Sequence, residues 1–141
     1  MARNLSKICV DSGGFIALVY KSDLQHKKAT QFYERVKQKA VFYTTNMVIS
    51  ETYTWLRYHV SHTVAVKFLD VTEEAALAGE LRIIGVDGPT EEKARQILGK
   101  YSDQDFSYVD ATSFAILDLL EIADVFGFDA HYRIFGKNLH P

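Results

Sequence analysis

Short apolar runs alternate with longer stretches of helical periodicity along this chain. Four runs have the length of buried strands, and they cover residues 7–10, 41–43, 81–86 and 123–128. Between these runs, apolar residues recur at steps of three and four, as on one face of a helix. The helices predicted in this way cover residues 15–19, 24–39, 47–60, 61–78, 91–99 and 107–120, and a turn of helix with a tail follows residue 129.

This alternation favours a mainly parallel sheet whose strands are joined by right-handed helical crossovers. No Asn-Gly or Asp-Gly pair joins two of the predicted strands as a hairpin turn does. With 141 residues and no repeat, linker or low-complexity segment, the chain is long enough for one domain with a full core. We therefore expect a single α/β domain over residues 1–141, with a three-layer α/β/α fold.

Polar residues mark the ends of several predicted elements. Asp23 and Asn46 precede helical segments and are expected to cap them. Gly13 and Gly14 follow the first strand and predict a tight turn there. His26, close to the start of the second helix, is expected on the helix surface.

Composition and charge exclude some classes of protein. Sixteen Lys and Arg against eighteen Asp and Glu give a net charge of −2, which is not the basic balance of a protein that binds mainly phosphate backbone. An enzyme that meets nucleic acid through a local patch and a metal ion is not excluded. Cys9 is the only cysteine, which excludes an intramolecular disulfide, and its apolar neighbours predict a buried side chain. No run approaches a membrane span and residues 1–6 lack a signal peptide's apolar segment, so a cytoplasmic location without membrane contact is expected.

Four carboxylates are distinguished by their positions. Asp11 and Asp129 each follow a predicted strand. Glu51 and Asp110 lie early in helices that follow a strand or loop at the same end of the sheet. Because ligands of open parallel sheets bind in the crevice beyond the carboxyl ends of the strands, all four side chains are expected to point toward one place.

Helical spacing places two of these acids on apolar stripes. The stripes consist of Val48, Glu51, Trp55 and Tyr58, and of Asp110, Phe114 and Leu117. A carboxylate on a core-facing stripe must be paired or bound to a metal, because burying it alone is strongly unfavourable. No Lys or Arg partner for Glu51 is evident in the sequence.

Each acid also has an ordinary structural role open to it. Asp11 and Asp129 are suited to turns. Asp110 matches a capping box with Ser107, whereas Glu51 fits no such box. For each acid alone, both interpretations stay open.

Together, the four acids favour a metal site. Converging carboxylates without matched cations repel one another, and hard oxygen ligands prefer Mg²⁺ or Mn²⁺. Such an ion lowers the pKa of a bound water and orients it toward a scissile phosphate. Other chemistry has less support, since the Gly13-Gly14 pair matches no nucleotide-binding motif, Ser12-Gly13-Gly14 is no nucleophile elbow, and the five histidines show no ligand spacing.

Four segments carry a resemblance to the PIN-domain nucleases. They are VDSGGFIAL at residues 10–18, TNMVISE at 45–51, YSDQDFSYVDA at 101–111 and FGFDAHY at 126–132. Their order and intervals extend the resemblance over about residues 8–136, which is nearly the whole chain. It implies a PIN-like parallel sheet flanked by helices and a metal-dependent endoribonuclease that hydrolyses RNA phosphodiester bonds.

The resemblance also implies roles and partners. Asp11, Glu51, Asp110 and Asp129 match the family's acidic quartet, which serves catalysis and binds Mg²⁺ or Mn²⁺. Asp11 and Asp110 would be the main ligands, while Glu51 and Asp129 complete the charge, orient waters or hold a second ion. Many small members are toxins of the VapC type, so an RNA substrate, a cognate antitoxin and a homodimer are the expected partners. A non-catalytic PIN-like scaffold and a receiver-like signalling domain are the alternatives.

Further residues have predicted roles in loops, at caps or on helix faces. A Thr that often lies near the last acid in the family is lacking beside Asp129. Asp103 and Asp105 add charge before Asp110 and could assist at the site, but solvated loop acids are the favoured interpretation. Ser12 and Asn46 either hydrogen-bond at the site or serve as turn and cap residues. The basic residues Lys21, Lys27, Lys28 and Arg57 are expected to lie on solvated helix faces, with steering of RNA as the alternative. Core or dimer packing is expected for Tyr53, Trp55 and Tyr58, with stacking on bases as the alternative.

Overall fold

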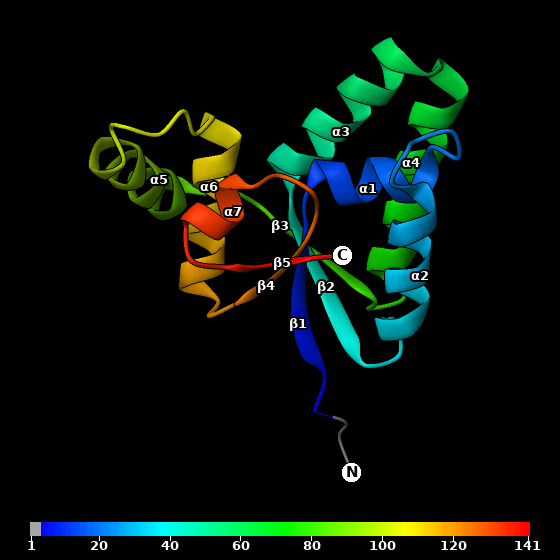
Figure 1. The fold of residues 1–141 in the computed structure, drawn as a ribbon, viewed down its shortest axis with the longest axis horizontal. Coiled ribbons are helices and arrows are strands. Elements are labelled where there is room, and N and C mark those ends of the chain that lie inside the picture. Colours follow the sequence, from blue (N-terminus) through cyan, green and yellow to red (C-terminus); the bar gives the residue numbers. More distant parts are fainter. Residues whose placement is uncertain (1–3) are drawn as a thin grey trace.

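The structure, a computed structural model that describes residues 4–141, has a five-stranded sheet between two layers of helices (Figure 1). Its elements are β1 (Ser6–Val10), α1 (Ser12–Val19), α2 (His26–Val36), β2 (Ala40–Thr45), α3 (Asn46–His59), α4 (His62–Leu77), β3 (Leu81–Ile84), α5 (Gly88–Lys100), α6 (Tyr108–Leu119), β4 (Asp124–Phe126), α7 (His131–Ile134) and β5 (Asn138–His140). The four strand pairings of the sheet are all parallel. The predicted three-layer α/β/α fold with a mainly parallel sheet is therefore confirmed.

The central strand of the sheet is β1, and the strand order is β3-β2-β1-β4-β5. The chain first leaves β1 toward β2 and β3, and later returns to the other side of β1 to form β4 and β5. The direction of winding thus reverses between β1 and β4. In open parallel sheets the crevice beyond the carboxyl ends of two such strands is the usual ligand site.

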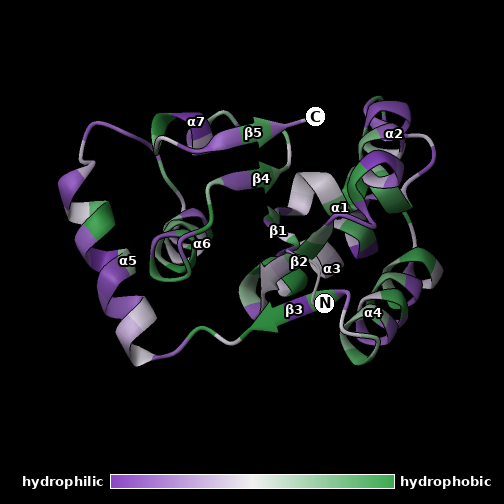
Figure 2. Ribbon diagram, turned by 90° about the horizontal axis from the view of Figure 1, so that it is seen from below, coloured by the Kyte–Doolittle hydropathy of each residue, from purple (hydrophilic) through white to green (hydrophobic). Residues whose placement is uncertain are grey.

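Alternate residues of β1 contribute to two separate cores, as the two-residue period of a strand requires. Ile8 and Val10 pack with residues of α1 to α4, and Cys9 packs with residues of α5 to α7. Figure 2 shows these two groups of helices on opposite sides of the strands. The predicted burial of Cys9 is confirmed, and burial also raises the pKa of its thiol, which disfavours the reactive thiolate.

The edge strand β5 lies in the segment that we expected to be a tail, so the prediction of four strands was wrong. Two of its three residues, Asn138 and His140, are polar, and the segment therefore has no apolar run to indicate a strand. Both side chains reach the Asp124 Oδ1 atom of β4, at 3.2 Å from Asn138 Nδ2 and 3.1 Å from His140 Nε2. β5 is thus held by its neighbour β4.

The helices differ from the predicted segments mainly at their ends. α2 has Gln25 at its N-cap, and Asp23 instead accepts a hydrogen bond from the Gln25 N–H at 2.8 Å. His26 is not a free surface residue, because its Nδ1 lies 2.6 Å from the Ala17 carbonyl oxygen of α1. Within residues 4–141, every helix is too short or too polar to cross a bilayer.

Candidate metal centre

Asp11 follows β1 directly and occupies the N-cap position of α1. Its N–H donates to the Phe126 carbonyl oxygen at 3.0 Å, and its own carbonyl accepts from the Phe15 N–H at 3.1 Å. The carboxylate makes no capping hydrogen bond and is only 5% exposed. The predicted strand-end position of Asp11 is confirmed, and its side chain does not cap α1.

The pKa of the Asp11 carboxyl is raised from 3.8 to about 7. Burial is the main cause, and the nearby carboxylates of Glu51 and Asp110 act in the same direction. The Ser12 N–H and the Tyr132 hydroxyl oppose them by favouring the charged form. A buried carboxylate near two others has the environment in which a bound cation is most stabilising.

Asp110 forms the predicted capping box and also faces His131. Its Oδ2 accepts from the Ser107 N–H at 3.0 Å while its own N–H donates to Ser107 Oγ at 2.9 Å, which is the predicted capping box of α6. The same Oδ2 lies 3.1 Å from Nδ1 of His131. The side chain of Asp110 is 14% exposed.

Asp129 lies three residues beyond the end of β4, so the expectation that it directly ends a strand was wrong. Gly127 and Phe128 form the intervening loop. Asp129 Oδ1 accepts from the His131 N–H at 2.9 Å, which is a turn role, and lies 3.3 Å from His131 Nδ1. Its side chain is 37% exposed.

His131 is the residue of this site that sequence reasoning missed. Its Nδ1 faces Asp110 and Asp129, and its Nε2 lies 2.9 Å from Oδ1 of Asp105. The spacing of histidines from one another gives no signal here, because the partners of His131 are three carboxylates. They lie in the loop before α6, in α6 and in the loop after β4. The nearby pair Asp129 and His131, two residues apart at a predicted turn, was the available signal.

Asp105 is a solvated loop acid, as predicted, with a side chain that is 95% exposed, and its Oδ1 also lies 2.9 Å from His131 Nε2. Asp105 contributes to the raised pKa of His131. Burial lowers the pKa of His131, but Asp110, Asp129 and Asp105 together outweigh this effect and raise it above 6.5.

Glu51 is exposed on α3, so the predicted buried stripe was wrong. The buried residues of this helix are Val48, Thr52 and Leu56. Thr52 can occupy the core because its hydroxyl donates to the Val48 carbonyl oxygen at 2.7 Å within the helix. Tyr58, placed on the predicted stripe, is 80% exposed. Glu51 still lies close enough to Asp11 to raise its pKa.

Asn46 has a structural role that the sequence left open. The N-cap of α3 is Thr45, whose side chain accepts from the Val48 N–H, so the predicted cap at Asn46 was wrong. Asn46 Oδ1 accepts instead from the Val86 N–H at 3.0 Å and joins the start of α3 to the segment after β3.

Three of these groups satisfy the spatial requirement of a metal site. One atom each from Asp110, Asp129 and His131 lie within 4.8 Å of one another. Asp11 and Glu51 add negative charge beside them. The donor set is mainly carboxylate oxygen, which fits a hard divalent cation.

The buried hydroxyl of Tyr132 lies near Asp11. Within residues 4–141, Ser113 Oγ and Tyr132 OH are the buried side-chain atoms that have no hydrogen-bond partner. Burial raises the pKa of Tyr132, and the Asp11 carboxylate raises it further. The Tyr132 hydroxyl lies outside hydrogen-bonding geometry but close enough to Asp11 to favour its ionised form, which is the form that binds a metal.

We expect the metal-free protein to lose stability as the pH rises from about 5 to about 8. Asp11 holds its proton up to about pH 7 in the folded protein, whereas it releases the proton near pH 3.8 in the unfolded chain. Between these pH values the folded state binds more protons, and a rise in pH therefore disfavours the folded state. The raised pKa of His131 acts in the same direction, because the stabilisation of its protonated form is lost as pH rises through the folded-state value. Urea unfolding in EDTA measures the free energy at both pH values. Equal or greater stability at the higher pH contradicts this expectation.

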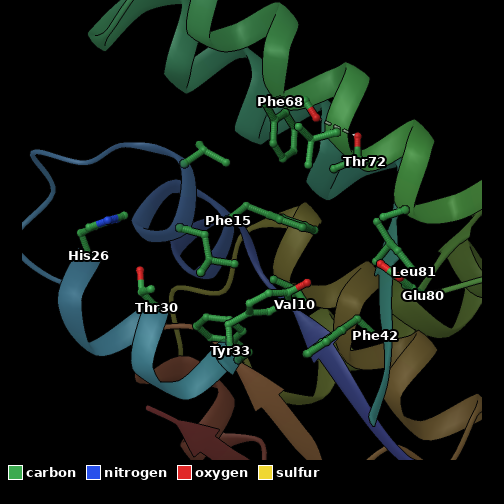
Figure 3. Close-up of a pocket in the computed structure, with 15 residues that line it drawn as sticks. Val10, Phe15, His26, Thr30, Tyr33, Phe42, Phe68, Thr72, Glu80 and Leu81 are labelled. Carbon is green, nitrogen blue, oxygen red and sulfur yellow. Dashed lines mark hydrogen bonds between the residues drawn. The ribbon is translucent and has the colours of Figure 1, made fainter. Parts of the chain in front are cut away.

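A separate hollow lies between α1, α2, α4 and the sheet, and Figure 3 shows it in close-up. Its volume is about 400 Å³. The apolar residues of its wall include Val10, Phe15, Phe42, Phe68 and Leu81, and its polar ones are His26, Thr30, Thr72 and Glu80. Glu80 is the one carboxylate among the lining residues of this hollow, and none of Asp110, Asp129 and His131 lines it. The hollow is therefore a candidate surface for an apolar partner and not the metal centre.

Comparison with known proteins agrees with this architecture. The family model described as PIN domain matches residues 8–133. The curated protein "23S rRNA-specific endonuclease VapC20" of Mycobacterium tuberculosis is 30% identical over 129 residues, which cover 92% of this chain and 94% of that protein. The resemblance found in the four sequence segments is thereby confirmed.

Solved structures share the fold over almost their full length. A crystal structure of M. tuberculosis VapC20, described as a sarcin-ricin loop cleaving toxin, has a TM-score of 0.85 at 28% identity and covers 95% of this chain and 99% of that chain. VapBC2 from Rickettsia felis, bound to a DNA fragment from their promoter, has a TM-score of 0.69 at 9% identity, with coverage of 95% and 97%. From its matched sequence and its fold, the chain belongs to the PIN domain family.

Proposed function

We infer that this protein is a metal-dependent endoribonuclease and the toxin of a toxin–antitoxin pair. The observation that carries the proposal is the convergence of acids at the reversal point between β1 and β4. Asp11 follows β1, Asp129 lies in the loop after β4, and Asp110 reaches the same crevice from the first turn of α6. The similarity to VapC20 supports ribonuclease chemistry for this set of acids.

The four predicted acids keep distinct proposed roles. Asp11 and Asp110 are the main ligands of a divalent cation, Mg²⁺ or Mn²⁺. Glu51 and Asp129 are more exposed and serve to complete the charge, orient water or hold a second ion. When bound, the cation supplies an activated water and stabilises the charge that develops on the phosphate. The chain itself supplies the negative crevice that holds the cation and the exposed edge through which RNA enters.

Ribosomal RNA is the first substrate to test, because VapC20 is described as specific for 23S rRNA. The exposed residues Lys21, Lys27, Lys28 and Arg57 are available to contact phosphate, as the sequence suggested. Tyr53 and Trp55 pack against the core, whereas Tyr58 is free for a partner or a base.

An antitoxin is the proposed protein partner, supported by the likeness to VapBC2. The apolar hollow between α1, α2 and α4 is the proposed surface for an apolar antitoxin segment (Figure 3). Exposed apolar side chains of α4, such as Val71, extend this surface. The predicted homodimer can be checked by light scattering of the isolated protein.

Loss of the cation or of Asp110 is expected to stop RNA cleavage. We expect EDTA to abolish cleavage of 23S rRNA and of a mixed RNA panel, and added Mn²⁺ to restore it. Asp110→Asn is expected to lower the rate at least about a hundredfold, because even residues that only orient metal ligands contribute up to that much. Asn keeps an acceptor oxygen for the Ser107 N–H, so the capping box survives.

Asp70→Asn is the matched control, since Asp70 is an exposed residue of α4. It is expected to cleave at the wild-type rate. Cleavage that continues in EDTA, or an unchanged rate in Asp110→Asn, contradicts the proposed function. Tight partner binding without metal-dependent cleavage of any RNA favours the non-catalytic scaffold.

A further inference from the structure

We propose that His131 is a nitrogen ligand of the divalent cation at this site and that Asp105 orients its ring. The proposal rests on the metal-dependent function above and adds two residues that lie outside the acidic quartet. His131 is the first residue of α7, and Asp105 lies in the loop before α6. The proposal therefore extends the site from four carboxylates to a mixed oxygen and nitrogen set.

The first argument is the spacing around Nδ1 of His131. This atom lies 3.1 Å from Asp110 Oδ2 and 3.3 Å from Asp129 Oδ1. Neighbouring ligands of an octahedral ion with bonds of about 2.1 Å are about 3 Å apart. The nitrogen thus lies at about the separation from each oxygen that adjacent ligands of one ion have, and all three atoms lie within 4.8 Å of one another.

The second argument is the contact at the other side of the ring. Nε2 of His131 lies 2.9 Å from Asp105 Oδ1. A histidine that binds a metal commonly donates its other ring N–H to a carboxylate, which fixes the tautomer and the ring orientation. A cation bound at Nδ1 would replace the proton that this atom can otherwise donate to Asp110, while the proton on Nε2 stays with Asp105.

The third argument is the restricted position of the ring. His131 packs edge-to-face against Phe106, with ring centroids 5.2 Å apart. Its backbone N–H donates to Asp129 at 2.9 Å, so the residue and one of its proposed co-ligands are fixed to each other. A ligand held in this way loses little conformational freedom when the ion binds.

An imidazole ligand changes which cation the site prefers. Mg²⁺ is bound mainly through oxygen, whereas imidazole suits transition metals. We therefore expect His131 to raise the affinity for Mn²⁺ and to leave the affinity for Mg²⁺ nearly unchanged.

The test is pulsed electron paramagnetic resonance of the full chain loaded with Mn²⁺. Wild-type protein is expected to show the ¹⁴N coupling of a directly bound imidazole, and His131→Gln is expected to lack it. By calorimetry, His131→Gln is expected to bind Mn²⁺ at least about tenfold more weakly and Mg²⁺ within about threefold of wild type. Asp105→Asn is expected to weaken Mn²⁺ binding about tenfold while the ¹⁴N coupling remains. His62→Gln, at an exposed position of α4, is the control and is expected to match wild type.

Bound Mn²⁺ without ¹⁴N coupling in the wild type overturns the proposal and assigns His131 only the role of a positive counter-charge. Coupling that persists in His131→Gln, or unchanged Mn²⁺ affinity in that variant, overturns it as well. In each of these results RNA cleavage that still requires metal leaves the proposed function standing. The wild-type spectrum and Asp105→Asn decide the question even if His131→Gln does not fold.

Discussion

Replacing Asp11 by Asn is expected to reduce RNA cleavage at least about a hundredfold, because the variant loses a buried charged ligand of the proposed cation. Asn has nearly the same shape, and the backbone hydrogen bonds that Asp11 makes to Phe126 and Phe15 are kept. The fold is therefore expected to survive. Rates on 23S rRNA in Mn²⁺, compared with wild type and with Asp70→Asn, measure this effect.

The same substitution is expected to stabilise the metal-free protein at about pH 8. At that pH the folded protein must ionise a carboxyl whose pKa is raised from 3.8 to about 7, mainly by burial, and Asn removes this penalty. A gain of a few kcal/mol in unfolding free energy follows from a shift of this size. Urea unfolding in EDTA measures it, and at about pH 4 the gain is expected to disappear.

The opposite signs of these two effects separate a site residue from a structural one. A turn residue that is needed for folding loses stability and activity together when it is replaced. Unchanged cleavage in Asp11→Asn, or a loss of stability in EDTA at about pH 8, contradicts the proposed role of Asp11.

Gly14→Ala is expected to destabilise the protein by about 3 kcal/mol. A Cβ at Gly14 would lie 2.6 Å from the Phe126 carbonyl oxygen, which is backbone and cannot rotate away. To make room, α1 must move away from β4. This movement occurs at the carboxyl ends of β1 and β4, where the crevice lies. Urea unfolding measures the loss, and cleavage is expected to fall because Asp11 and Asp129 move apart.

Gly13→Ala is the matched control, one residue earlier in the same helix. Its Cβ would meet Phe128 at 3.6 Å, an ordinary contact, so no clash is expected. Ala is favoured over Gly within a helix, and a gain of about 0.5 kcal/mol is the expected result. Equal effects of the two substitutions contradict the argument from close approach. The sequence suggested a tight turn at this glycine pair, whereas the structure shows that Gly14 permits contact between α1 and β4.

Much of the candidate site could be predicted because its signals are local. Asp11 stands at the end of an apolar run, and the capping box of Ser107 and Asp110 is contained in four consecutive residues. Glu51 was wrongly predicted to lie on a buried face of its helix. The buried face of α3 includes the polar residue Thr52, and helical spacing of apolar residues alone cannot predict that. The direction in which a helix faces is set by what packs against it.

By itself, the sequence determined the alternation of strands and helices, the parallel α/β/α fold and the burial of Cys9. These features follow from hydrophobic periodicity, which is a property of neighbouring residues. Only the tertiary structure decided that β5 pairs with β4, that Gly14 lies against Phe126, and that His131 lies among three carboxylates. Each depends on contact between segments that are distant along the chain or separated by a turn, where no local pattern records which side chains meet.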